Sequence, residues 1–339
     1  MNNSLKRKTI CIYGSGAIGL DLGIKLIVGG HKVTFIARGS TLSSLKNSGI
    51  VYQTGKEERV IAPDMYSCTE DCNSAGRQDY VFLTVNADSL LSVSDNLPSL
   101  FHDKTVVVSA TNGIPPWFSY LQNSTIGRYL DASAPQTRFF RSVSPDRIIG
   151  AIIQRSIIKK GDNVIIHTSG TGYKLGELDH TVKSRTLALK ELLEESGFTA
   201  GLSTDIHRDI WIKLLGNICV NPLSVITGKK IGDMIDDKQI LQRMKLLVEE
   251  TKNVGIKLGI IKSEDYIFQD FLSIVDSNFR DHETSMLQSF KKGKNLEVHR
   301  ILQAPIMLAE LKGVDIQIPN LKAMCREIQQ KIQTAQAIL

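Results

Sequence analysis

The sequence predicts an α/β domain built on a doubly wound parallel sheet, followed by an all-helical domain. In the first part of the chain, short apolar runs alternate with helical stretches, an order that favours parallel strands with helices on both faces of the sheet. A glycine-rich turn joins the first apolar run to the first helix. After about Asp205 the strand-like runs stop, and helical segments separated by Gly and Pro follow. We therefore expect two domains, residues 1–204 and residues 205–339.

The apolar runs of the first domain are expected to form its strands. They are Thr9–Tyr13, Lys32–Ala37, Tyr80–Val85, Thr105–Ser109, Ile148–Gln154 and Val164–Thr168. Helices are expected at Ile18–Val28 and Ala87–Leu97. The last two strands flank Lys159-Lys160-Gly161-Asp162, which predicts a hairpin at the edge of the sheet. A further helix is expected to open at Thr181, with Val182, Leu189, Leu192 and Leu193 on its apolar face, and to end at Gly197.

The second domain is expected to contain only helices. The predicted segments are Ile206–Val220, Ile240–Val254, a stretch around Ser285, and Leu296–Lys312. Pro222 should kink or end the first of them, because proline cannot donate the helical hydrogen bond. No internal repeat and no low-complexity linker interrupts the chain.

The glycine-rich turn is the strongest functional signal of the first domain. It follows the buried strand Thr9–Tyr13 directly and consists of Gly14, Ser15, Gly16, Ala17, Ile18 and Gly19. The first glycine allows a tight turn, the second lets the backbone approach a pyrophosphate, and the third lets the helix pack closely on the strand. The free N–H groups of the following helix attract the anion. This context predicts a Rossmann-type dinucleotide site rather than an ordinary strand–helix turn.

The end of the second strand indicates which dinucleotide binds. An NAD site usually carries Asp or Glu there, accepting hydrogen bonds from the ribose 2′-hydroxyl. Here the strand is followed by Arg38, Ser40 and Thr41. A guanidinium and two hydroxyls suit a 2′-phosphate better, although a solvated arginine at a strand end is the alternative. The sequence therefore predicts NADP(H).

Composition limits the remaining function classes. The net charge of +6 is not gathered into one block, and no basic cluster is interleaved with aromatic residues, so we expect no nucleic-acid partner. No run of about 18 apolar residues occurs, and the polar start of the chain does not resemble a secretory signal, so we expect no membrane span and a cytoplasmic protein. The 5 cysteines are scattered, and the spacing of Cys68 and Cys72 lacks a second ligand pair, so neither disulfides nor a metal site is expected.

A polar stripe opens the second domain. Lys213, Asn217 and Asn221 recur at every fourth position, while Trp211 and Leu214 beside them are apolar. Residues at this spacing share one face of a helix. Such a stripe either faces solvent or lines an enclosed cavity, and the spacing alone leaves both possibilities open.

Together these motifs resemble the ketopantoate reductase (2-dehydropantoate 2-reductase) family. The glycine turn, Arg38, Thr111-Asn112-Gly113 and the lysine–asparagine helix with Pro222-Leu223 occur in the family's order. The C-terminal part agrees at Ser285-Met286-Leu287-Gln288, Glu297, Gly313 and Pro319-Asn320. The resemblance covers nearly the whole chain, and its lysine–asparagine helix is far more specific than the glycine motif.

The resemblance implies a fold, a reaction and a set of site residues. It implies a second domain like the C-terminal domain of 6-phosphogluconate dehydrogenase, and reduction of ketopantoate to pantoate by NADPH in pantothenate biosynthesis. Carried over from the family, Lys213 is the proton donor, Asn217 and Asn221 hold the substrate's polar groups, and Ser285 binds its carboxylate. In the same way, Asn112 lies near the nicotinamide end and helps to position the substrate, and Glu297 approaches both the substrate and the nicotinamide ribose.

Some positions depart from the family's pattern and leave alternatives open. Asn86 stands where the family commonly has a lysine, and His299 and Gln303-Ala304 stand where it commonly has an acidic residue and Asn-Gly. The polar contact that the family often supplies just ahead of the serine is also expected to differ, with His282 and Glu283 at that place. Reduction of a different 2-oxo acid on the same scaffold is therefore one alternative. A non-enzymatic NADP(H) sensor is another, disfavoured by the retained Lys213, and a methyltransferase would leave Arg38 unexplained. The apolar C-terminal residues are compatible with a homodimer.

Overall fold

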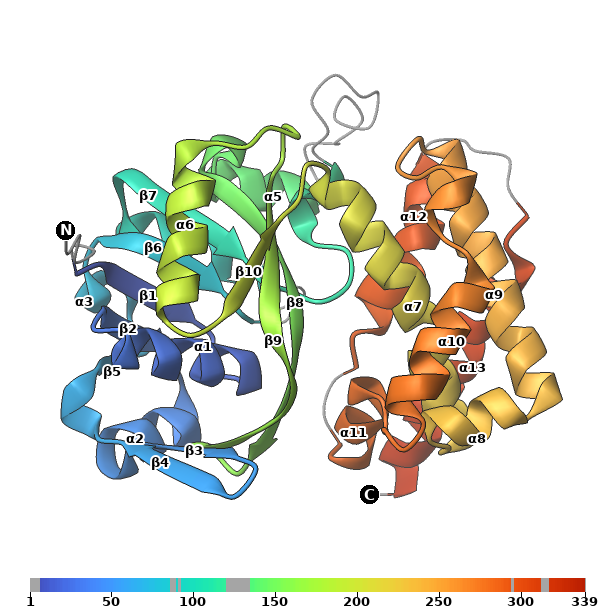
Figure 1. The fold of residues 1–339 in the computed structure, drawn as a ribbon, viewed down its shortest axis with the longest axis horizontal. Helices are drawn as coiled ribbons and strands as arrows, with labels where there is room; N and C mark the ends of the chain where they lie inside the picture. Colours follow the sequence, from blue (N-terminus) through green and yellow to red (C-terminus); the bar gives the residue numbers. More distant parts are fainter. Residues whose placement is uncertain are drawn as a thin grey trace. The chain divides into compact units, whose positions relative to one another are not determined.

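The computed structural model describes residues 7–85, 90, 93–119, 135–293, 296–311 and 317–338 (Figure 1). The chain divides into two compact units, with the division between Ile206 and His207. The departure at Asn86, the family glycine Gly313 and the chain end at Leu339 lie outside the described residues.

The first unit is built on a single large sheet. The described residues form 10 strands, in the order β4-β3-β9-β8-β7-β6-β1-β2-β5, while β10 pairs with β9 off this path. The strands are β1 (Thr9–Tyr13), β2 (Lys32–Ile36), β3 (Ile50–Thr54), β4 (Glu57–Ile61), β5 (Ser67–Thr69), β6 (Gln78–Leu83), β7 (Phe101–Ser109), β8 (Ile148–Lys160), β9 (Val164–Glu177) and β10 (Thr199–Leu202).

The parallel part of the sheet confirms the predicted fold class. Strands β5, β2, β1, β6, β7 and β8 are neighbours in that order, and each adjacent pair is parallel. The apolar residues of β1 and β2 are almost fully buried, as expected for strands covered on both faces. Their carboxyl ends therefore meet at one edge of the sheet.

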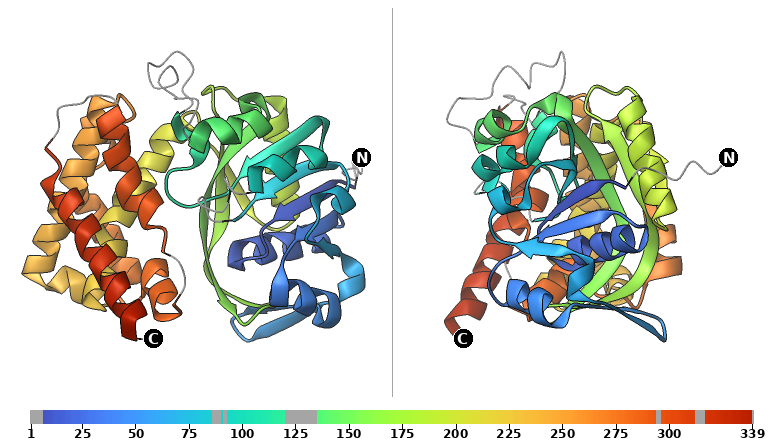
Figure 2. Two further views of the ribbon diagram at one scale, coloured as in Figure 1. Left: turned by 180° about the vertical axis from the view of Figure 1, so that it is seen from behind. Right: turned by 90° about the vertical axis from the view of Figure 1, so that its left-hand side faces the viewer.

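The β8–β9 hairpin is antiparallel as predicted, but the prediction that it lies at the sheet edge is wrong. Strand β7 pairs with β8 on one side. On the other side, β3 pairs with the first half of β9 and β10 with its second half. Figure 2 shows the two long strands curving together across the unit. The added strands were not predicted because β3 and β10 have only five and four residues, and four of the five residues of β4 are exposed.

The helices of the first unit agree with the sequence only in part. They are α1 (Ala17–Val28), α2 (Gly39–Ser48), α3 (Cys72–Ala75), α5 (Pro135–Ser142) and α6 (Ser184–Glu195), with short 3-10 segments that include η2 (Ser94–Leu100). The predicted helix Ala87–Leu97 lies partly outside the described residues, and its described end belongs to η2.

Helix α6 begins later than predicted. Both the backbone N–H and the hydroxyl of Thr181 donate to the Asp179 carboxylate, which holds Thr181 in a turn before the helix. Val182 is exposed, whereas Leu189, Leu192 and Leu193 are buried as expected. Gly197 follows the helix with a φ of +81°, a left-handed conformation that favours glycine.

Helix α1 is enclosed by the sheet that carries the nucleotide motif. It contacts β1 and β2 and also β3, β8 and β9, so the sheet curls around it. Gly23 allows this close packing, because a Cβ there would lie 2.2 Å from the Phe35 ring. Most of the helix is buried in consequence, including the charged residue Asp21.

The described residues of the second unit form helices and the turns between them, with no strand, as predicted. Its elements are α7 (Ile206–Thr227, whose first residue belongs to the first unit), α8 (Ile231–Asp236), α9 (Lys238–Lys257), η6 (Ser263–Asp265), α10 (Phe268–Phe279), α11 (Ser285–Lys291), the π-helix η7 (His299–Gln303), α12 (Ala304–Leu311) and α13 (Pro319–Ile338). The sequence predicted none of α8, α10 and α13. Glu250 of α9 stabilises the start of α13 by accepting hydrogen bonds from the backbone N–H groups of Asn320 and Leu321, at 3.0 and 2.8 Å.

Helix α7 continues through Pro222 to Thr227, so the predicted end near Pro222 is wrong. Leu223 and Val225, beyond the proline, are buried and hold the last turns in the core. Among the described helices, α7 alone is long and apolar enough to cross a membrane, with a mean hydropathy of 1.4. About two thirds of it (67%) is buried inside the protein, as in the core helix of a globular domain.

Candidate functional site

The glycine turn has the geometry that a bound pyrophosphate requires. Gly14 has a φ of +115°, and a Cβ there would lie 2.7 Å from the Val85 side chain. A Cβ on Gly19 would lie 1.9 Å from the Gly14 carbonyl oxygen. Gly16, the N-cap residue of α1, has no atom within 4 Å of its Cβ position, so the space in front of the helix is open. The first and third glycines are thus needed for packing, and the second faces room for a ligand.

Two neighbouring strand ends hold the turn in place. The Ser15 hydroxyl donates to the Ile36 carbonyl oxygen at 3.3 Å, which ties the turn to the end of β2. The Thr84 hydroxyl donates to the Gly14 carbonyl oxygen at 2.7 Å, which ties it to the end of β6. Ala17 and Ile18 form the first turn of α1 and are half-buried. Thr84 was not predicted, because a single threonine after a strand carries no distinctive signal.

Arg38 and Asn112 lie at the same edge of the sheet as the glycine turn. Arg38 follows β2 and is the exposed N-cap residue of α2. Asn112 follows β7 and is half-buried, and Gly113 after it has a φ of +70°. Since β1, β2, β6 and β7 are parallel, these loops and the glycine turn extend from the same ends of adjacent strands. That edge is where open α/β sheets bind nucleotides.

In the second unit, α7 presents the predicted polar stripe. Lys213 and Asn217 are half-buried, and Asn221 is buried. Burial lowers the pKa of Lys213 to about 8, and the Glu297 carboxylate acts in the opposite direction. An ammonium with this pKa exchanges its proton near neutral pH, which suits a general acid. The structure thus brings Lys213 and Glu297 close enough to interact.

Ser285 is held against the same helix by two hydroxyls that the sequence did not indicate. Thr284 is the N-cap of α11, and its hydroxyl oxygen lies 2.5 Å from the Ser224 hydroxyl. The Ser224 hydroxyl donates to the Asn221 carbonyl oxygen at 2.7 Å. Ser285, the exposed first residue of α11, directly follows the residue that contacts α7. A threonine before a serine is too common in sequences to have revealed this link.

Two of the positions that depart from the family's pattern, His299 and Gln303, contact each other. His299 Nδ1 lies 2.8 Å from Gln303 Oε1, across the π-helix η7. π-Helical turns are rare in proteins, and many of those that do occur lie at functional sites. The segment begins just after Glu297, whose carbonyl oxygen accepts a hydrogen bond from the Ile301 backbone N–H at 3.0 Å. The two departures are therefore in direct contact on the segment that follows Glu297.

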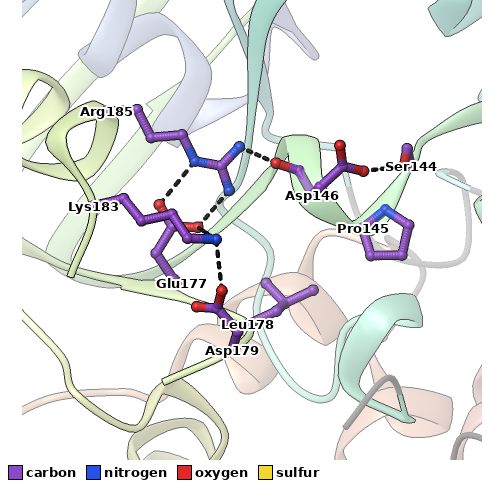
Figure 3. A pocket seen from close by; sticks show the side chains of 8 residues that line it. All are labelled: Ser144, Pro145, Asp146, Glu177, Leu178, Asp179, Lys183 and Arg185. Atoms are coloured by element: carbon purple, nitrogen blue, oxygen red, sulfur yellow. Dashed lines mark hydrogen bonds and ion pairs between the residues drawn. The ribbon is translucent and has the colours of Figure 1, made fainter. Parts of the chain in front are cut away.

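A separate polar pocket of about 150 Å³ in the first unit is structural (Figure 3). Its charged groups pair with one another: Arg185 binds the buried Glu177 carboxylate, and Lys183 lies 2.6 Å from Asp179. Arg185 also donates to the Asp146 carbonyl oxygen. These contacts join α6 to β9 and to the turn before β8. These charged groups neutralise one another and stabilise the packing of the unit, so we assign the pocket no ligand.

Comparison with known proteins identifies related sequences for both units. The family model described as ketopantoate reductase PanE/ApbA matches residues 10–180, and the model of its C-terminal part matches residues 205–332. A 2-dehydropantoate 2-reductase of Mesorhizobium japonicum is 29% identical over 324 residues, 93% of this chain and 95% of that protein. The enzyme of the same name from Archaeoglobus fulgidus is 24% identical over 92% of this chain and 94% of its own length.

Solved structures show the same fold. A putative ketopantoate reductase from Ralstonia solanacearum superposes with a TM-score of 0.88 at 27% identity, covering 97% of this chain and 99% of that one. A D-mandelate dehydrogenase bound to NADH and anilino(oxo)acetate superposes with a TM-score of 0.80 at 19% identity, covering 96% and 98% of the two chains. At that identity the second likeness concerns the fold alone.

Proposed function

Because this chain belongs to the ketopantoate reductase family of oxidoreductases, which act on CH–OH groups with a pyridine nucleotide, we propose that it reduces ketopantoate to pantoate with NADPH. The observation that carries the proposal is the stripe of α7, where a half-buried lysine with a pKa of about 8 shares a helix face with two asparagines. Neither a plain nucleotide-binding protein nor a sensor needs such a proton donor.

The first unit is proposed to bind the nucleotide. Gly14 and Gly19 make the turn possible, and the open space at Gly16 fits a pyrophosphate in front of α1. Arg38 binds the 2′-phosphate through its guanidinium, and Asn112 positions the nicotinamide end. The cofactor, when bound, supplies the hydride.

The second unit is proposed to bind the 2-oxo acid and to supply the proton. The Lys213 ammonium donates a hydrogen bond to the ketone oxygen and transfers its proton as negative charge develops there. Asn217 and Asn221 hold the substrate's polar groups, and Ser285 binds its carboxylate. Glu297 contacts the substrate and the nicotinamide ribose, and it favours the protonated lysine that the reduction needs.

The cellular role follows from this reaction. The pantoate formed is a precursor of pantothenate, so we propose that the enzyme serves pantothenate biosynthesis in the cytoplasm.

The test is oxidation of NADPH by the purified protein with ketopantoate, beside 2-oxo acids that lack its hydroxyl or its gem-dimethyl group. The proposal predicts rapid turnover of ketopantoate and slow turnover of the truncated acids, since the loss of the polar contacts of the hydroxyl or of the apolar contacts of the methyl groups costs transition-state binding. If only another 2-oxo acid is turned over rapidly, that acid replaces ketopantoate as the proposed substrate, and the proposed mechanism stands. Nucleotide binding without turnover of any acid would overturn the enzymatic proposal.

A further inference from the structure

The tip of the β8–β9 hairpin reaches the nucleotide turn. Lys159, near the end of β8, donates from Nζ to the Ser15 carbonyl oxygen at 2.9 Å and to the Thr41 hydroxyl at 3.2 Å. Ser15 belongs to the glycine turn, and Thr41 lies in the first turn of α2, which Arg38 caps. A lysine from a distant part of the sequence thus brings a positive charge between the two segments expected to bind phosphate.

Further contacts fix the hairpin tip to α2 and to the strand that follows it. The Thr41 hydroxyl donates to the Asp162 carboxylate at 3.2 Å. The Asn163 amide donates to the Gly49 carbonyl oxygen at 2.8 Å, just after α2 ends. Strand β3 then pairs in parallel with β9 from Val51 and Val164 onwards. The tip is therefore held at both ends of α2, and the position of Lys159 is built into the sheet.

The neighbouring lysine provides a natural contrast. Successive residues of a strand point to opposite faces, so Lys160 does not share the position of Lys159. Lys160 is exposed, whereas Lys159 is half-buried between Ser15 and Thr41. The sequence alone does not distinguish the two lysines, and the hydrogen bonds of Lys159 to Ser15 and Thr41 do.

We propose that Lys159 is a second cation, beside Arg38, that recognises the 2′-phosphate of NADP(H). The inference rests on the proposed use of NADP(H). A 2′-phosphate carries nearly two negative charges, more than one guanidinium neutralises. The adenosine ribose of a bound dinucleotide lies at the end of the second strand, where Arg38 and Thr41 are found. Lys159, held by Thr41, is placed to add its charge there.

The experiment is a calorimetric titration of the full-length protein with NADPH, NADH and adenosine 2′,5′-bisphosphate. The variant Lys159→Met keeps the length of the side chain and removes its charge, and Lys160→Met is the matched control. We expect Lys159→Met to weaken NADPH and the bisphosphate by about tenfold to a hundredfold and NADH by less than about twofold, the scale of a lost hydrogen bond to a charged group. Lys160→Met should bind all three ligands as the native protein does, and Lys159→Arg should recover most of the affinity.

The outcomes separate this inference from the function on which it rests. An equal loss for NADPH and NADH in Lys159→Met would overturn the inference, because it would mean that the lysine only supports the glycine turn. If the native protein prefers NADPH and Lys159→Met keeps the same preference, the inference is overturned and the use of NADPH stands. Native protein that binds NADH as tightly as NADPH would overturn both.

Discussion

Arg155 of β8 binds both carboxylate oxygens of Asp21 in α1, from Nε at 2.7 Å and from a terminal nitrogen at 2.8 Å. The two side chains are 1% and 0% exposed, so the pair is fully desolvated. The arginine also lies over the Phe198 ring, 5.1 Å from its centroid. This pair joins the helix that carries the nucleotide motif to the strand that carries Lys159.

Removing one partner of this pair should destabilise the first unit strongly. Asp21→Ala leaves the Arg155 charge buried without its carboxylate, and we expect the free energy of unfolding to fall by about 3–5 kcal/mol. Urea unfolding followed by Trp117 fluorescence in a Trp211→Phe background reports on this unit, because Trp117 and Trp211 are the only 2 tryptophans and lie in different units. Glu194→Gln, which breaks the surface pair with Lys190, should cost less than about 1 kcal/mol and serves as the control. An unchanged urea midpoint in Asp21→Ala would contradict the assigned role.

The rate of reduction should fall as pH rises through the pKa of Lys213. Below about 8 the lysine carries the proton that it must donate, and above about 8 it has lost it. We therefore expect kcat/KM to decline about tenfold for each pH unit on the alkaline side. The measurement is a pH profile of kcat/KM with ketopantoate. A rate that is flat to high alkaline pH would exclude Lys213 as the titrating donor.

Lys213→Ala should lower kcat by about a hundredfold to ten-thousandfold while leaving the affinity for NADPH nearly intact, because it removes a proton donor and no nucleotide contact. Steady-state kinetics and nucleotide titration on the same preparation measure the two quantities. Lys213→Arg retains the charge but holds its proton too tightly, so its residual rate should lose the alkaline decline. Turnover of the alanine variant at the native rate would disprove the mechanism.

Glu297→Gln should move the alkaline limb of the same pH profile to lower pH. The Glu297 carboxylate raises the pKa of Lys213 against the effect of burial, so removing its charge lets burial lower the pKa further. If Glu297 also contacts the substrate, KM for the oxo acid should rise about tenfold. Glu310→Gln, which removes an exposed charge paired with Lys322, should leave the profile unchanged. A Glu297→Gln profile identical to the native one would show that the carboxylate does not act on Lys213.

Arg38→Ala should weaken NADPH far more than NADH, by about tenfold or more, because the guanidinium is expected to contact only the 2′-phosphate. Fluorescence titration with both nucleotides measures the ratio. The control is Arg59→Ala, an exposed arginine of β4 outside the nucleotide edge. Equal losses for the two nucleotides would count against recognition of the 2′-phosphate by Arg38.

The site was predictable where its signal is local. Gly14, Gly16 and Gly19 carry backbone requirements that can be recognised from their spacing, and α1 begins within one residue of the predicted position. The stripe of Lys213, Asn217 and Asn221 follows from helical periodicity. Contacts made through common residues were not predictable. Thr84 holds the glycine turn, and the contact between Ser224 and Thr284 joins α11 to α7. Serine and threonine are common at such positions, so their types carry no signal.

The strands of the sheet likewise differ in how far the local sequence predicted them. Strand β1 was predicted with its observed limits because its burial on both faces demands an apolar run. Strand β4, with Glu57, Glu58 and Arg59 exposed, exists because β3 pairs with it in the folded sheet. The interior position of the β8–β9 hairpin depends on β3, which lies far from it in the chain, and on β10, which follows it after helix α6.

The two-part architecture, the nucleotide turn and the residue types available for hydride reduction could be predicted from the sequence, because each depends on the periodicity or backbone freedom of neighbouring residues. The curling of the sheet around α1, the pairing of the buried charges, and the choice of which of two adjacent lysines contacts the glycine turn became known from the folded chain alone. Asp21 and Arg155 are 134 residues apart, and Lys159 lies 144 residues from Ser15. Such contacts depend on the packing of distant segments, for which a local pattern holds no signal.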